Sequence, residues 1–162
     1  KGKNYTYSTS DQISKNSNIN TTTKFSSLDF IKYIYYNNFN TVMINTDGKI
    51  IINGNFIRSI LNKSCIFYGS SLNGRLKGSK DLLKCRYKLP IIISESNRLI
   101  FFPVNKYFWI NFNMIESFEK KENHTIITFK NGYKRSIFVS YRVVNNQMLK
   151  CSRLWLEYLE RK

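Results

Sequence analysis

The chain has 162 residues, enough for one domain with a sizeable buried core, and its 42% hydrophobic content excludes a disordered acidic chain and a coiled coil. No stretch approaches the roughly 18 apolar residues of a membrane span, and no signal segment opens the chain. Its 26 Lys and Arg against 10 Asp and Glu give a net charge of +16, which indicates a polyanionic partner.

The first part of the chain divides into a polar arm and the start of a folded domain. Residues 1–27 are rich in Ser, Thr, Asn and Lys without apolar periodicity, which predicts a flexible basic arm. The domain then spans 28–162 and opens with an aromatic, β-branched strand over 30–36. Two apolar runs within 41–53 flank Asp47-Gly48, which predicts a hairpin whose central residues tolerate positive φ.

A short helix and an irregular segment follow. Asn55 is a candidate N-cap for a helix that buries one apolar face, formed by Phe56, Ile57, Ile60 and Leu61. From 67 to 80, several Gly, Ser and Asn residues interrupt the pattern and predict an irregular loop. Residues 81–88 fit either a helix or a strand.

Beyond Pro90 the sequence predicts six successive strands, at 91–94, 99–102, 107–111, 115–120, 125–129 and 134–139. Asn131-Gly132 is a type I′ turn signal between the last two. Ser140 caps a final helix whose apolar stripe is expected to pack in the core, and that stripe consists of Tyr141, Val144, Met148, Cys151, Trp155 and Tyr158. The fold class is therefore α+β, with an antiparallel sheet of several hairpins, a short internal helix and a C-terminal amphipathic helix.

Cysteine, histidine and acidic residues argue against an enzyme. Cys65, Cys85 and Cys151 are widely spaced without a CxxC pair, so neither a zinc site nor a disulfide framework is expected, and a reducing cytoplasm fits best. His124, the only histidine, lies within a strand pattern. The carboxylates have no paired spacing that would build a two-metal site. We expect no catalytic residue, cofactor or metal.

Residues 69–76, Gly-Ser-Ser-Leu-Asn-Gly-Arg-Leu, come close to the phosphate-binding loop of nucleotide hydrolases. The pattern fails where that loop needs Lys and a hydroxyl residue for magnesium, because Arg75 and Leu76 stand there. Two interpretations stay open. Small residues beside cations suit the oxygens of a nucleic-acid phosphate, and the same stretch also fits a plain irregular connection.

The charge is concentrated in two blocks, each with a net +7, over residues 58–88 and 120–162. The composition, with no alanine and abundant Lys, Asn and Ile, points to a low-GC bacterial genome, which inflates Lys but does not deplete Asp and Glu. Clustering favours a nucleic-acid footprint over an evenly solvated surface. We expect Arg75 to enter a DNA groove, and Lys77, Lys80 and Lys63 to contact phosphates. The full set of expected DNA-contacting residues is Arg75, Lys77, Lys80, Lys63, Ser70, Ser71, Asn73, Gly74, Lys84 and Arg86.

An ordered series of short motifs resembles the ComK family of competence transcription factors. The resemblance covers roughly residues 41–158. Its motifs are Ser64-Cys65-Ile66-Phe67-Tyr68-Gly69-Ser70-Ser71, Gly74-Arg75, Gly78, Lys88-Leu89-Pro90-Ile91, Phe102-Pro103, Trp109-Ile110, Thr128-Phe129, Asn131-Gly132, Ser140-Tyr141 and Asn146-Gln147. The polar arm has no counterpart in the family, and the chain ends before the family's C-terminal segment, which bears on multimerisation and regulated degradation.

The resemblance implies an activator of DNA-uptake genes that binds AT-rich promoter boxes as a homo-oligomer, through the minor groove, under the control of a proteolytic adaptor. The narrow, negative minor groove of A-tracts favours inserted cations, which agrees with the composition. Two alternatives remain. In the first, the C-terminal half resembles LytTR-type domains that read the major groove. In the second, the protein is a nucleic-acid-acting enzyme of unknown type. Membrane-surface binding is not expected, because the basic blocks do not form one amphipathic helix.

Overall fold

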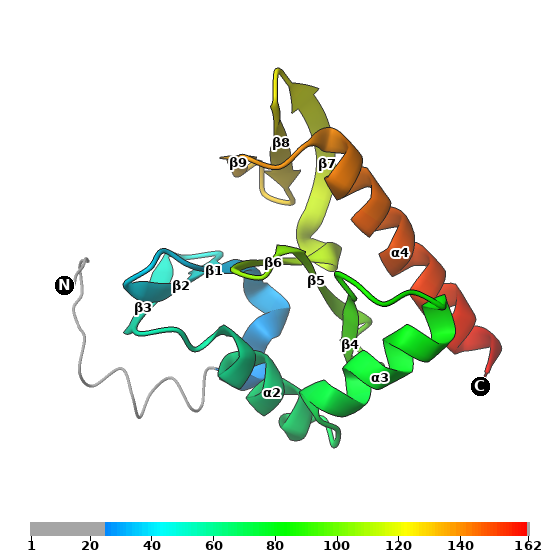
Figure 1. Cartoon of the computed structure of the whole chain (residues 1–162). Coiled ribbons are helices and arrows are strands. Elements are labelled where there is room, and N and C mark those ends of the chain that lie inside the picture. The colour runs from blue at the N-terminus through cyan, green and yellow to red at the C-terminus, as the bar shows by residue number, and fades with distance from the viewer. Residues whose placement is uncertain (1–24, 162) are drawn as a thin grey trace.

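The computed structural model describes residues 25–161, which form two antiparallel sheets with helices on both sides of the larger one (Figure 1). The six-stranded sheet has the order β3-β2-β1-β6-β5-β4, and the three-stranded sheet has the order β7-β8-β9. The strands are β1 (Ile31–Tyr36), β2 (Asn40–Asn45), β3 (Lys49–Asn53), β4 (Ile91–Ser94), β5 (Leu99–Asn105), β6 (Phe108–Asn111), β7 (Ile115–Lys121), β8 (His124–Phe129) and β9 (Lys134–Ile137). The helices are η1 (Phe25–Phe30), α2 (Ile57–Phe67), α3 (Leu72–Leu83), η2 (Phe112–Met114) and α4 (Tyr141–Glu160).

This architecture confirms the predicted α+β class and all the predicted strands, with ends shifted by one to three residues in several of them. None of the described helices is long and apolar enough to cross a membrane. The predicted arm, 1–27, lies outside the described residues except for 25–27, which belong to η1. The boundary between arm and domain therefore stays a prediction.

Both predicted hairpins form, but by other means than those expected. In the β2–β3 hairpin, Gly48 does not have positive φ; instead the Asn45 side chain accepts hydrogen bonds from the backbone N–H groups of Asp47 and Gly48, at 3.0 and 2.7 Å. Between β8 and β9, Asn131 and Gly132 do have positive φ, at 90° and 83°. The bond from Phe129 N–H to the Tyr133 carbonyl makes this connection longer than a two-residue type I′ turn.

The prediction of an irregular loop over 67–80 is wrong, because α3 begins at Leu72. Ser71 is its N-cap, and its hydroxyl accepts a hydrogen bond from Gly74 N–H at 3.0 Å. Gly74 and Gly78, which suggested a loop, lie inside the helix. Burial of Leu72 and Leu83 offsets the poor helix propensity of these glycines.

Each face of the six-stranded sheet has its own core. On one face, α2 buries Ile57, Ile60 and Leu61, as its apolar periodicity predicted. Its expected cap, Asn55, accepts only a long hydrogen bond from Ile57 N–H, at 3.4 Å. On the other face, α4 and the three-stranded sheet cover Phe102 and Ile110. The C-terminal stripe does pack there: Val144 and Cys151 are buried and three further members are partly buried, while Tyr141 is more exposed and contacts Phe118.

A cluster of cations and aromatic rings joins the two sheets. The guanidinium of Arg135, from β9, lies 5.3 Å from the ring centre of Tyr33 and 5.1 Å from that of Tyr35, both in β1. It also donates a hydrogen bond to the Tyr33 hydroxyl, which is 2.9 Å from the Tyr133 hydroxyl. Lys32, only 2% exposed, donates to the Asn45 carbonyl and lies over the Tyr133 ring. These contacts fix the three-stranded sheet on the larger one.

Candidate nucleic-acid interface

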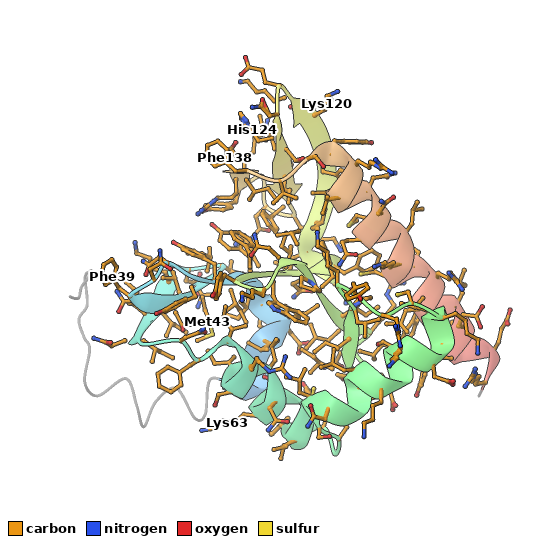
Figure 2. All side chains as sticks on the ribbon, viewed as in Figure 1. Phe39, Met43, Lys63, Lys120, His124 and Phe138 are labelled. Carbon is orange, nitrogen blue, oxygen red and sulfur yellow. The ribbon has the colours of Figure 1, made fainter. Side chains whose placement is uncertain are left out.

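The structure gathers the predicted DNA-contacting residues on and around α3. Lys63 lies on α2, on the side of the molecule opposite Lys120 (Figure 2). The others belong to the α2–α3 connection, to α3 itself or to the segment that follows it, in the order Ser70, Ser71, Asn73, Gly74, Arg75, Lys77, Lys80, Lys84 and Arg86.

Three of these cations share one exposed side of α3. Lys77, Lys80 and Lys84 are all exposed, and a rotation of 100° per residue places them within about 60° of one another. Lys84 ends the helix in the left-handed conformation, with φ of 57°, and its N–H bonds to the Lys80 carbonyl. We call these three residues the α3 basic face. Their spacing suits the phosphates of a nucleic-acid backbone.

Two acidic groups beside α3 are paired with arginines. Asp81, on the same helix, pairs with Arg161 at the end of α4, with 3.1 Å between Oδ2 and Nη1. Glu95, which follows β4, pairs with Arg75 at 3.2 Å. The α3 basic face therefore keeps a positive potential with little local compensation.

Arg75 is held in place, which removes the basis of its predicted groove insertion. Its Nη2 pairs with Glu95, its Nε donates to the Ser70 hydroxyl at 3.1 Å, and its side chain is 19% exposed. The Ser70 hydroxyl in turn donates to the Cys65 carbonyl. The flexible, Gly-flanked phosphate loop does not exist: a helix start replaces it, and the Ser70 and Ser71 hydroxyls are used within the protein.

Two of the three thiols are buried, and the histidine packs on an aromatic ring. Cys65, Cys85 and Cys151 are free thiols. Burial raises the pKa of Cys65 to about 11, partly opposed by the Arg75 charge, and burial raises the pKa of Cys151 as well. The ring of His124 packs on Phe138, near Lys120 at the far end of the three-stranded sheet (Figure 2). Among the described residues, no cluster of His, Cys, Asp or Glu could hold a metal ion.

The part of the second basic block that lies on the three-stranded sheet does not make a comparable surface. The β7–β8 hairpin carries Lys120 and Lys121 but also three glutamates, so its charge is mixed. Arg135 of this block is packed among aromatic rings. Mixed charge and internal packing make this region a weaker candidate for a phosphate footprint than α3.

Sequence reasoning missed a set of polar residues on α4 and next to it. Gln147 is 1% exposed, and Lys150 and Arg153 follow it on one side of the helix, near Lys88. Lys150 and Arg153 fall outside the apolar stripe, and no sequence pattern groups them with Lys88. Their three-residue spacing does place them on one side of a helix, but the chain segment facing them could not be foreseen.

Comparison with known proteins agrees with the motifs. The ComK protein family model matches residues 30–162. The competence transcription factor of Bacillus subtilis (strain 168) is 31% identical over 108 residues, which cover 63% of this chain and 56% of that protein. The chain thus spans about half the length of this relative. A LytTr DNA-binding domain of a putative methyl-accepting/DNA response regulator from Bacillus cereus matches with a TM-score of 0.39 and 10% identity, over 76% of this chain and 82% of that one. Because the family model covers nearly the whole described part, the chain belongs to the ComK family.

Proposed function

We propose that this protein is a DNA-binding transcription regulator of competence genes that contacts duplex DNA through the α3 basic face. The observation that carries the proposal is the alignment of Lys77, Lys80 and Lys84 on one exposed side of α3, next to acids that are already paired. Membership of the ComK family and the similarity to a competence transcription factor support it. The protein acts in the cytoplasm by binding rather than by catalysis.

We further propose that AT-rich duplexes are preferred and that Arg86 enters the minor groove. Arg86 is exposed and lies in the irregular segment between α3 and β4, in neither of the two ion pairs of the described residues. A planar, weakly hydrated guanidinium is favoured in the narrow groove of A-tracts. This assigns to Arg86 the role that the sequence suggested for Arg75.

Self-association on DNA is supported by α4. Leu156 and Leu159 are 61% and 43% exposed and lie three residues apart, on one side of the helix. Two copies that bury these leucines against each other would present two α3 basic faces to paired DNA boxes. Sedimentation of Leu156→Lys on a two-box duplex should show single copies where the unmodified protein sediments as a dimer or larger. Control by an adaptor of proteolysis stays a prediction from the family resemblance.

The preference is tested by fluorescence anisotropy with AT-rich and GC-rich duplexes of equal length. The unmodified chain should bind the AT-rich duplex more tightly, and Arg86→Ala should reduce the ratio of the two affinities. A minor-groove dye should compete, whereas methylation of major-groove positions should have little effect. Equal affinity for both duplexes would contradict AT-rich recognition, and loss of binding on major-groove methylation would favour base readout of the LytTR kind.

A further inference from the structure

An open pocket of about 350 Å³ lies between α4 and the segment that links α3 to β4. It is lined by Lys88, Val143, Asn146, Gln147, Leu149, Lys150 and Arg153. Three of these side chains are cationic and none is acidic. The pocket is larger than a single phosphate needs and falls at the lower end of the size of small-molecule sites.

The wall of this pocket is built by a buried amide. Gln147 is 1% exposed, and its Nε2 donates to the Lys88 carbonyl at 2.9 Å and to the Pro103 carbonyl at 2.6 Å. Lys88 has a φ of 50°, a left-handed backbone that needs such support. The position of the 87–88 turn against α4 is therefore fixed by a hydrogen-bonded side chain rather than left to surface packing.

The same turn positions one of the charges. The Lys150 ammonium donates to the Tyr87 carbonyl at 2.9 Å, which leaves two of its three N–H groups for other acceptors. Neither Lys88 nor Arg153 takes part in the two ion pairs of the described residues. Three cations thus converge on one pocket that has no carboxylate among its lining residues, an arrangement that suits a phosphate.

We infer that this pocket binds a phosphate group with its attached sugar, supplied by the backbone of DNA. The inference rests on the proposed function and extends it, because Lys84 of the α3 basic face is followed within four residues by Lys88 of the pocket. A strand whose phosphates contact α3 would continue along the 86–88 segment toward α4. Tyr87, 77% exposed beside the pocket, offers a ring that can contact the sugar.

The test compares two sets of variants of the full chain. In the first, Lys150 and Arg153 are both changed to Gln, which keeps hydrogen-bonding ability and removes the charge. In the matched control, Arg142→Gln removes an exposed cation near the start of the same helix, outside the pocket. Thermal melting of both variants verifies that the fold is intact.

Duplex affinity is measured at several salt concentrations. The double variant should reduce the slope of log affinity against log salt by about two units, and Arg142→Gln should leave it unchanged. If duplex still binds and the slope of the double variant is unaltered, the pocket inference is wrong while the proposed function stands. Absence of duplex binding by the unmodified chain would refute the proposed function instead.

The pocket can also be tested alone, with thymidine 5′-monophosphate as the probe. The side-chain amide NMR signals of Gln147 should shift on titration in the unmodified chain and stay fixed in the double variant. A shift with the nucleotide together with an unchanged DNA slope would assign the pocket to free nucleotides and overturn the DNA backbone as its ligand. If the Gln147 signals do not shift with the nucleotide and the DNA slope of the double variant is also unaltered, the pocket binds no phosphate group and the inference is wrong.

Discussion

Replacing Arg75 with alanine separates a structural role from a DNA-reading role. The change removes the ion pair with Glu95 and the hydrogen bond from Nε to the Ser70 hydroxyl. The ion pair is partly solvated, because the Arg75 and Glu95 side chains are 19% and 43% exposed, so it contributes only up to about 1 kcal/mol. The hydrogen bond adds about 0.5–1.5 kcal/mol. We expect a total loss of about 1–2 kcal/mol in the free energy of unfolding, without a change in the preference for AT-rich over GC-rich duplexes.

The assay is thermal unfolding together with anisotropy on both duplexes. A loss of this size lowers Tm by about 3–8 °C in a domain of this length. Lys77→Ala is the matched control on the same helix: it should leave Tm within about 2 °C and weaken both duplexes alike. If Arg75→Ala leaves Tm unchanged and reduces the preference for AT-rich duplexes, Arg75 does not stabilise the fold through Glu95 and Ser70. That result would favour insertion of Arg75 into the DNA groove.

Four further outcomes follow from the packing. Gly78→Ala should raise the free energy of unfolding by about 1 kcal/mol in urea denaturation, since nothing lies within 4 Å of the added methyl and alanine is the better helix former. Arg135→Met should lower the free energy of unfolding by about 2 kcal/mol, because one hydrogen bond and the contacts with three aromatic rings are lost. An unchanged midpoint of urea denaturation would contradict the claim that Arg135 holds the two sheets together. In a timed reaction with a thiol reagent, Cys85 should react before Cys65 and Cys151, which are buried with raised pKa values. Stability should also fall between about pH 9 and pH 11, because the unfolded thiols ionise first while the folded Cys65, with its pKa of about 11, stays protonated; Cys65→Ala should reduce that fall.

Strong periodicity made most of the fold predictable. The alternating runs after Pro90 specify strands whatever their partners, and the stripe on α4 identifies its buried side from the sequence alone. Sequence could not show that β1 pairs with β6, because that pairing joins segments more than seventy residues apart in the chain. The error over α3 has a clear cause: Gly74 and Gly78 are poor helix formers, and only tertiary burial of Leu72 and Leu83 makes the helix stable.

The sequence predicted that the cations of the first basic block lie together, but it did not predict how Arg75 is held. The first basic block identified the α3 cations correctly as neighbours, since charge clustering in sequence survives folding into a helix. The partner of Arg75 was not predictable, because Glu95 lies twenty residues away beyond β4. Gln147 shows the same limit: only the fold brings its amide to the carbonyls of Lys88 and Pro103.

The central claim, that the α3 basic face contacts the DNA backbone, is tested most directly by the salt dependence of duplex affinity. Changing Lys77 and Lys80 together to Gln should reduce the slope of log affinity against log salt by about two units, on AT-rich and GC-rich duplexes alike. Changing Lys120 and Lys121 together to Gln removes the same charge from the β7–β8 hairpin, on the opposite side of the molecule, and should leave the slope unchanged (Figure 2). A reduced slope for the Lys120 and Lys121 variant, with an unaltered slope for the Lys77 and Lys80 variant, would place the DNA on the three-stranded sheet and contradict this account.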